Sequence, residues 1–295
     1  MNNELEFIYI CQGKKYICGS VDDKLVVYDF ESHIIVENII PLIMNCIIYK
    51  SKQILDTLIK SRIKVIAFDF GCTLSQNHLS PYENILEDIV NNPNKYKNFI
   101  IGNWNIMIFD TLCDILRKGG IDVVIASNGN REVEYALLKK TFKYKKKKII
   151  TQRVVAIYLL CKSVFYGKKI IPYQTLPEFF IFIYSKFNEK MKDTIDIHQN
   201  VFFDKLEEII KPYDSDAKIP KLKDKKDIPD KSIMLEIALI ITKNKEKSSI
   251  ILIDDNEKNI ERITKSGYKG IHIKPSACEN HGFIHTFNII NKMKN

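Results

Sequence analysis

Three apolar runs in the middle and C-terminal parts of the chain are each ended by a polar residue. The runs are 63–68, 123–126 and 250–253, apolar apart from Lys64, and the residues that end them are Asp69, Ser127 and Asp254. Uninterrupted apolar runs are typical of parallel strands buried on both faces of a sheet. Segments with helical spacing alternate with them, at 106–118, 131–140 and 231–243. This alternation predicts an α/β fold with a Rossmann-like, doubly wound parallel sheet.

The first 60 residues follow a different pattern. Short alternating or apolar runs extend from Leu5 to about Ile40 and are separated by Gln-Gly and Asp-Asp turn signals. This pattern predicts a small antiparallel β meander. Residues 52–62 then carry apolar side chains at helical spacing, so an amphipathic helix is expected to lead into the first core strand.

Two stretches interrupt the alternation of strands and helices. The first, 75–103, is rich in Pro and Asn and holds one short helical pattern at 82–90. The second, 143–227, holds an aromatic cluster at 179–184 that is expected in the core, and a Pro- and Lys-rich run at 212–229 that suits either a mobile lid or an exposed linker. The expected organisation is a meander plus helix (1–60), an α/β core (61–142 and 228–295) and an inserted, cap-like segment (143–227), which is either a cap domain or extra helices.

The composition, 45% hydrophobic and 27% charged over 295 residues, is that of an ordinary globular protein. The formal net charge of +9 suggests an anionic partner, but only five of the 45 cationic residues are Arg, the side chain best suited to phosphate and base recognition. Most of the charge is therefore expected on a solvated surface, and nucleic acid is not the expected partner.

Seven scattered cysteines without a CxxC pair indicate neither a disulfide framework nor a zinc site. The N-terminus lacks the positive charge of a secretory signal, and the longest apolar stretch, 33–49, is interrupted by Glu37, Pro41 and Asn45. No membrane-spanning segment is expected. These features predict a soluble, cytoplasmic protein and leave its oligomeric state open.

The polar residues that follow the three strands carry the candidate chemistry. Asp69 at the carboxyl edge of the sheet could act as a nucleophile, bind a metal, or only cap a turn or helix. Ser127 lies in Ser-Asn-Gly, which is also good turn chemistry. Asp254 and Asp255 are adjacent carboxylates that suggest a hard cation such as Mg²⁺, although exposed acids at a turn give the same pattern. All of these residues are expected to share one crevice.

The order of these residues resembles the motifs of the haloacid dehalogenase-like (HAD) hydrolase superfamily over Ile63–Ile273. The four motifs correspond to FDFGCTL, VVIASNGN, Lys231 in DKSIMLEIA, and ILIDDNEKNIERITKSGYKGIHI, in which Asn259 and Gly267 also fit. Other lysines lie close to Lys231 and are alternatives for the third motif, namely Lys223, Lys225 and Lys226. The resemblance implies a HAD-like core and a reaction of the phosphatase type.

The resemblance also implies a covalent mechanism. Asp69 would attack phosphorus in line and form an aspartyl-phosphate that water then hydrolyses. Ser127 and Lys231 would hold the phosphoryl oxygens, and Asn128 would add a further contact. Thr73 would brace the loop beside the substrate. Mg²⁺ would be bound by Asp69, the backbone carbonyl of Gly71, and Asp254 or Asp255.

Gly71 is a departure from the family pattern. HAD phosphatases usually carry a second Asp at this position, which protonates the leaving oxygen and later activates water. General acid–base catalysis typically contributes about 10²–10⁴-fold, so alkyl phosphates should turn over slowly. Glycine here implies a different leaving group, a residue supplied from elsewhere, or lost catalysis. His78 and Glu83 are nearby candidates, although a surface His and a helical Glu are the preferred interpretations.

Three functions follow from these residues. The first is a HAD-like, Mg²⁺-dependent phosphatase for a small phosphorylated substrate. The second is a pseudo-phosphatase whose phosphate pocket serves for binding or protein interaction. The third is a nucleic-acid-end phosphatase or binder, which depends on the run 139–148, where Phe142 and Tyr144 are interleaved among seven lysines. The end of a solvated helix that enters a strand at 149–150 is the preferred interpretation of this run.

Overall fold

The computed structural model describes residues 4–11, 14–21, 24–36, 39–75, 84–142, 148–167, 173–191, 199–215 and 231–273. At its centre lies a five-stranded parallel sheet, which confirms the predicted α/β class. In spatial order the strands are β6 (Ile149–Ile150), β5 (Asp122–Ala126), β4 (Val65–Phe68), β7 (Ile250–Asp254) and β8 (Lys269–His272). The chain moves outward from β4 in one direction through β5 and β6, and then returns to the other side of β4 for β7 and β8.

The strands are apolar throughout because helices cover both faces of the sheet. Successive side chains of a strand point to opposite faces. In β4, Ile66 and Phe68 lie in one apolar cluster, and Val65 and Ala67 lie in a second. Burying an aliphatic or aromatic side chain stabilises a fold by about 1.5–3 kcal/mol, so neither face tolerates a polar residue until the strand ends.

The predicted core helices are confirmed. They are α4 (Asn103–Lys118), which joins β4 to β5, α5 (Arg131–Phe142), which follows β5, and α9 (Lys231–Ile241), which precedes β7. A short 3-10 helix, η5 (Lys247–Ser249), and α10 (Glu257–Lys265) flank β7. The two glycines after α4 stop it as expected, and Gly120 adopts a φ of +80°, which suits glycine.

The N-terminal meander is also present in the structure. Strands β1 (Glu4–Cys11), β2 (Lys14–Val21) and β3 (Lys24–Asp29) form an antiparallel sheet, and the next apolar run contributes only an isolated bridge between Tyr28 and Ile35. The following helix, α1 (Ile40–Lys60), begins well before the predicted 52–62. Pro41 does not interrupt it, because a proline in the first turn loses no helical hydrogen bond.

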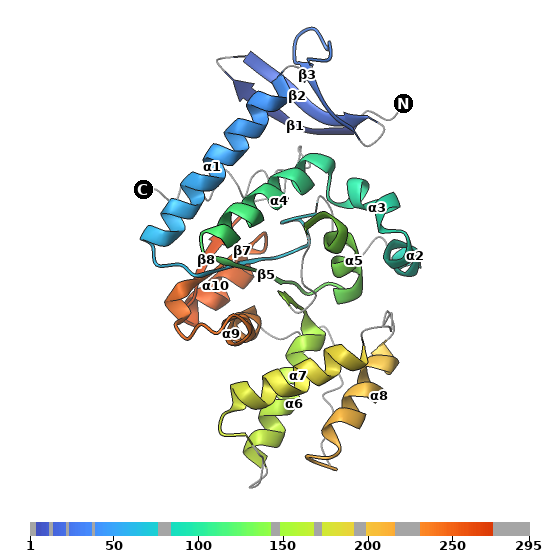
Figure 1. Ribbon diagram of the computed structural model, residues 1–295, viewed down its shortest axis with the longest axis vertical. Helices are drawn as coiled ribbons and strands as arrows, with labels where there is room; N and C mark the ends of the chain where they lie inside the picture. Colours follow the sequence, from blue (N-terminus) through green and yellow to red (C-terminus); the bar gives the residue numbers. More distant parts are fainter. Residues whose placement is uncertain are drawn as a thin grey trace.

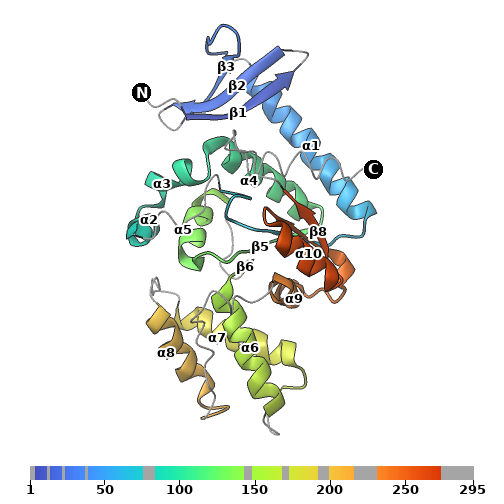
Figure 2. The ribbon, with the colours of Figure 1, turned by 180° about the vertical axis from the view of Figure 1, so that it is seen from behind.

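The remaining helices flank this core. Helices α2 (Leu86–Asn91) and α3 (Pro93–Ile100) lie beside α5, whereas α6 (Gln152–Gly167), α7 (Leu176–Lys190) and α8 (Gln199–Ile210) extend to the end of the molecule opposite the meander (Figure 1). The view from behind shows the same order, with the sheet between the meander and these three helices (Figure 2).

Helices α6 to α8 share one continuous apolar cluster with α9 and one face of the sheet. Phe179, Phe180 and Tyr184 of the aromatic cluster on α7 are buried in it, as expected. Strand β6 falls inside the range 143–227 predicted for the insertion, so the central sheet extends into that range. Most of the 212–229 run, residues 143–147 of the lysine run, and His78 and Glu83 lie outside the described residues.

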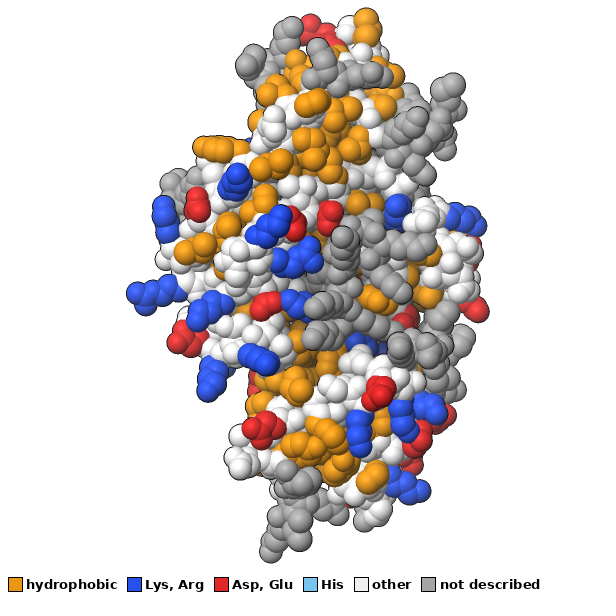
Figure 3. Space-filling view, in the orientation of Figure 1, with side chains coloured by type: hydrophobic (Ala, Val, Ile, Leu, Met, Phe, Trp, Pro, Cys, Tyr) orange, Lys and Arg blue, Asp and Glu red, His pale blue; other side chains and the backbone are white. Residues whose placement is uncertain are grey.

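Within the described residues, no helix combines the length and the apolar character needed to cross a membrane. Charged side chains of both signs intermingle over the middle of the face shown in Figure 3, whereas hydrophobic side chains gather over the meander end and again over the opposite end of the molecule. Exposed large hydrophobic side chains in that part of the chain include Phe30, Ile34, Ile35 and Leu42.

Candidate active site

A cavity of about 740 Å³ opens at the carboxyl end of the sheet. It lies where the strand order reverses between β4 and β7, the position at which open α/β sheets bind their ligands. The loops after β4, β5 and β7 and the first turns of α5 and α10 line it, together with Leu86 of α2 and His272 of β8. The structure brings six of the predicted site residues into this lining: Asp69, Gly71, Ser127, Asn128, Asp254 and Asp255.

Lys231, the first residue of α9, is buried next to this cavity and contacts residues that line it. Its Nζ lies 2.5 Å from Oδ1 of Asp69 and 3.5 Å from Oδ2 of Asp254, and it donates a hydrogen bond to the carbonyl oxygen of Ala126. One buried ammonium therefore holds the carboxyl ends of β4, β5 and β7 together. The alternative lysines, Lys223, Lys225 and Lys226, lie outside the described residues.

Burial and charge shift the ionisation of this pair. Burial raises the pKa of Asp69 to about 7; the Lys231 ammonium opposes this shift, and the carboxylates of Asp254 and Asp255 add to it. Burial alone lowers the pKa of Lys231, but Asp69 and Asp254 raise it by more, so the ammonium stays charged. A further cation beside the carboxylates would favour the ionised form of Asp69.

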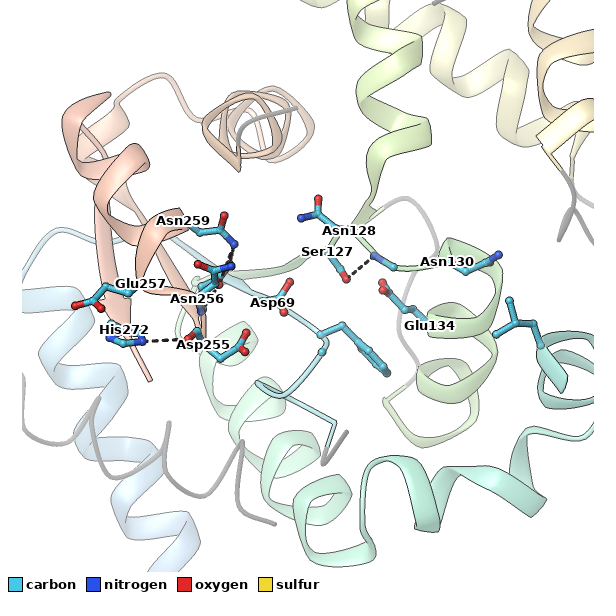
Figure 4. Close-up of a pocket in the computed structure, with 15 residues that line it drawn as sticks. Asp69, Ser127, Asn128, Asn130, Glu134, Asp255, Asn256, Glu257, Asn259 and His272 are labelled. Atoms are coloured by element: carbon cyan, nitrogen blue, oxygen red, sulfur yellow. Dashed lines mark hydrogen bonds between the residues drawn. The ribbon is translucent and has the colours of Figure 1, made fainter. Parts of the chain in front are cut away.

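The carboxylate of Asp254 is held in place from the α10 side. Its Oδ1 accepts hydrogen bonds from the backbone N–H of Asn256 at 2.8 Å and from Nδ2 of Asn259 at 3.1 Å, and Nδ2 also lies 3.1 Å from Oδ2. The neighbouring Asp255 is half-buried, and its carbonyl oxygen lies 3.0 Å from Nε2 of His272 (Figure 4). This gives a physical role to Asn259, which the sequence indicated only through the family pattern.

Ser127 and the following turn form the opposite wall. The backbone N–H of Ser127 donates to Ile150 at 3.0 Å, which continues the pairing of β5 with β6, and its Oγ accepts a hydrogen bond from the backbone N–H of Gly129 at 3.0 Å. Asn130 caps α5 by accepting from the N–H of Glu132 at 3.0 Å. Ser-Asn-Gly therefore makes the turn that its composition predicts and also faces the cavity.

The loop after Asp69 is tightly folded. The carbonyl of Phe70 accepts hydrogen bonds from the backbone N–H of Leu74 at 3.0 Å and of Ser75 at 2.9 Å. Cys72 at the tip has a φ of +53°, a conformation that costs a non-glycine residue roughly 1–2 kcal/mol. Thr73, also in this loop, is buried, does not line the cavity, and its Oγ1 has no hydrogen-bond partner among the described residues.

Glu134, in the first turn of α5, is a cavity residue that the sequence did not indicate. Its side chain is fully buried, it lines the cavity, and apart from the nearby Ser127 hydroxyl no described group is placed to hydrogen-bond its carboxyl oxygens. Burial raises its pKa to about 8; the nearby Ser127 hydroxyl opposes this shift and the charge of Asp69 adds to it. An acid near a helix N-terminus ordinarily indicates only a favourable interaction with the helix dipole, so no local signal marked it.

The cavity has a strong excess of acidic groups. Five acidic residues line it: Asp69, Glu134, Asp254, Asp255 and Glu257. Among the described residues no Lys or Arg lines the cavity. Lys231 lies outside this lining and contacts two of the acids, Asp69 and Asp254. Within the described part of the chain, no three His, Cys, Asp or Glu side chains form a ready-made metal cage. The donors present are nonetheless oxygen atoms on adjacent loops, which suit Mg²⁺, because this ion is typically held by one or two carboxylates and keeps several waters.

Comparison with known proteins adds no relative: no family model, curated protein or solved structure matches the chain.

Proposed function

We propose that this protein is a HAD-like, Mg²⁺-dependent phosphohydrolase that cleaves a small phosphorylated substrate through an aspartyl-phosphate. The observation that carries the proposal is the ammonium of Lys231, which contacts Asp69 at 2.5 Å and Asp254 at 3.5 Å beside a cavity that Ser127 also lines. These residues come from three strand ends and one helix start, which are far apart in the chain. If these residues only formed surface turns or helix caps, residues from four separate segments of the chain would not need to meet at one place.

The topology supports the same proposal. Counted along the chain from β4, the strand order is 3-2-1-4-5, and the cavity lies at the point where this order reverses. Asp69 follows the central strand, Ser127 follows one of its neighbours, β5, and Asp254 is the last residue of the other, β7. This is the arrangement that the HAD resemblance implies for a nucleophile, a phosphate ligand and a metal ligand.

Each residue has a definite task in the proposed reaction. With Oδ1 of Asp69 bound to Lys231, Oδ2 would attack phosphorus in line with the departing oxygen. The Lys231 ammonium and the Ser127 hydroxyl would stabilise the charge that develops on the phosphoryl oxygens, and Asn128 lines the cavity where it can add a contact. Thr73 is buried within this loop and does not line the cavity, so its role would be to support the backbone that carries Asp69.

The acidic excess of the cavity fits a bound cation. Asp69, the carbonyl of Gly71, and Asp254 or Asp255 would hold Mg²⁺, with Asn259 orienting Asp254. Bound there, the ion would neutralise charge on the transferring phosphoryl group. The same excess opposes entry of a polyanion, which supports a small substrate with one phosphoryl group over nucleic acid.

Phosphate release from 4-nitrophenyl phosphate, measured with Mg²⁺ and with excess chelator, tests the proposal. Wild type should be active only with Mg²⁺, and Asp69→Asn should lose activity because the amide cannot attack phosphorus. Asp114→Asn, which changes an exposed acid of α4 that pairs with Lys118, is the matched control and should retain full activity. Equal rates for wild type and Asp69→Asn would reject the enzyme.

Gly71 favours a second candidate function, a pseudo-phosphatase that binds phosphate without turning it over, because this position supplies no acid–base side chain. The same assay with Gly71→Asp separates the two. Activity that appears only in Gly71→Asp and needs Asp69 would mean that the natural chain is a phosphate-binding module. Binding of inorganic phosphate to wild type, lost in Ser127→Ala, would then support that function.

A further inference from the structure

The departing oxygen of an unactivated phosphate ester needs a proton, and the described cavity contains few groups that could supply it. Asp69 and Asp254 are bound to Lys231, Asp255 lies where the cation is proposed, and Glu257 is exposed to solvent. Three of these acids are therefore engaged by Lys231 or by the proposed cation, and the fourth faces solvent. His272 also lines the cavity, but its Nε2 lies 3.0 Å from the carbonyl oxygen of Asp255, which leaves Glu134 as the remaining titratable group of the lining.

The geometry of Glu134 suits a group that acts on a bound ligand. It is fully buried, and apart from the nearby Ser127 hydroxyl no described group is placed to hydrogen-bond its carboxyl oxygens, an arrangement that is costly unless a ligand or a proton compensates. Figure 4 shows its carboxyl group directed toward Ser127 and the space beside Asp69. The Ser127 hydroxyl is the proposed phosphate anchor, so a phosphoryl group bound there would lie next to Glu134.

Gly129 makes this position possible. A Cβ atom added at Gly129 would lie 2.2 Å from Oε1 of Glu134 and 3.3 Å from Oγ of Ser127. The close approach of the carboxyl group to the turn after β5 therefore depends on the absence of a side chain at residue 129. This is an independent indication that the turn and the acid are fitted to one another.

Burial favours the neutral form of Glu134 in the absence of a ligand. Burial raises its pKa to about 8; the Ser127 hydroxyl opposes the shift, the Asp69 carboxylate adds to it, and the Lys231 ammonium again opposes it. A carboxyl group that keeps its proton at neutral pH can donate it, and one that loses it to a leaving group can accept a proton from water.

We propose that Glu134 is the catalytic acid and base of this site, in the role for which Gly71 has no side chain; this inference rests on the proposed phosphohydrolase function. In the first step a bond forms between Asp69 and phosphorus, the bond from phosphorus to the leaving oxygen breaks, and that oxygen takes the proton of Glu134. In the second step water attacks phosphorus and gives one proton to Glu134, the bond from phosphorus to Asp69 breaks, and inorganic phosphate leaves. Both side chains return to their starting states.

The test compares two substrates that differ in their need for a proton. Nitrophenolate leaves 4-nitrophenyl phosphate unprotonated near neutral pH, whereas phenolate, a much stronger base, leaves phenyl phosphate with difficulty unless it is protonated. With enzyme in excess, the rate of phenol release in a single turnover reports the first step alone. Glu134→Gln should slow this step by about 10²–10⁴-fold with phenyl phosphate and far less with 4-nitrophenyl phosphate.

Two controls separate proton transfer from a structural effect. Glu257→Gln makes the same chemical change at an exposed residue that lines the same cavity, and it should leave the ratio of the two rates unchanged. Gly71→Asp, added to Glu134→Gln, should restore much of the rate with phenyl phosphate, because it supplies an acid from the loop after β4. Glu134→Asp, which keeps the acid on a shorter side chain, should lose less than Glu134→Gln.

Equal slowing of both substrates in Glu134→Gln, with no rescue by Gly71→Asp, would overturn the role of Glu134. In that case the Asp69-dependent activity of wild type would still support the phosphohydrolase. A wild-type protein without Asp69-dependent activity would overturn the proposed function, and the role of Glu134 with it.

Discussion

Replacing Lys231 by Met should strongly destabilise the fold. Methionine has nearly the length and apolar body of lysine, so the substitution removes the charge with little change in packing. The side chains of Lys231 and Asp254 are each only 1% exposed, so water cannot replace the lost ammonium at Asp254, whereas Asp69 is 13% exposed at the cavity. The variant would bury Asp69 and Asp254 beside one another without their common partner.

The magnitude follows from the burial of the group. Removing one partner of a buried ion pair typically costs about 3–5 kcal/mol, because the remaining charge is left without compensation. Asp69 can reduce this cost by taking up a proton. Its pKa is about 7 with Lys231 present, and it would rise further without the ammonium. The loss should therefore be largest at alkaline pH and should shrink as the pH falls.

Urea unfolding, followed by the fluorescence of Trp104, measures this loss. Trp104 is the single tryptophan of the chain and is buried in α4, so its emission should report loss of the core. Lys118→Met is the matched control: Lys118 pairs with Asp114 at 2.7 Å, but its side chain is 77% exposed. Exposed helical pairs of this kind contribute only about 0.3–0.5 kcal/mol. Chelator in every sample excludes effects of bound metal.

Equal stability of Lys231→Met and Lys118→Met at alkaline pH would refute the reasoning. It would mean that Lys231 does not compensate buried carboxylates in the folded protein. Asp69→Asn in the Lys231→Met background should recover part of the loss, since it removes one of the uncompensated charges. Failure of this second substitution to recover stability would count against the pair in the same way.

Three further predictions concern the neighbouring residues. The raised pKa of Glu134 means that the folded state holds a proton which the unfolded state releases, so stability should fall by a few kcal/mol as the pH rises from 4.5 to about 8. Glu134→Gln should flatten this part of the urea-unfolding pH profile. An unchanged slope would contradict the raised pKa of Glu134. Gly129→Ala should cost about 1–3 kcal/mol in thermal unfolding by displacing that carboxyl group, and a neutral effect would show that the turn adapts. Asn259→Ala should weaken Mg²⁺ activation about 10–100-fold by releasing Asp254, and an unchanged Mg²⁺ titration would remove Asn259 from the site.

The sequence was sufficient to predict how the main site residues meet. Buried parallel strands give uninterrupted apolar runs, and the backbone alone brings their carboxyl ends to one edge of the sheet. Asp69, Ser127 and Asp254 therefore meet because of where the runs stop, and no knowledge of side-chain packing is needed. Lys231 could be placed only through the family pattern, since one lysine among many neighbours carries no periodic signal.

Glu134 could not be predicted because its burial depends on distant packing. It lies in the first turn of α5, where an acid is favourable in almost any helix. Its position in the cavity follows from the direction in which α5 leaves β5 and from the missing side chain of Gly129. Neither of these is expressed in the spacing of polar and apolar residues.

The helices outside the core were hard to predict for a related reason. Helices α6 and α7 are apolar on several sides because they are buried between other helices and the sheet, so no narrow apolar stripe marked them. The prediction of α1 rested on the apolar spacing within residues 52–62, so its start at Ile40, directly before Pro41, was missed. Only the local geometry of the first helical turn distinguishes a proline that starts a helix from one that breaks it.

The central place of β4 has a consequence for how the protein is made. The contact between Lys231 and Asp69 spans 162 residues, and β7, one of the two neighbours of β4, follows Lys231 in the chain. As the chain leaves the ribosome, β4 can pair with β5 early, but its other edge stays open until α9 and β7 have been synthesised. Open edges of parallel sheets pair slowly and invite aggregation. A nascent chain of this protein should therefore depend on chaperones most during the synthesis of residues 143–254, and it should acquire its reactive centre only when that delay ends.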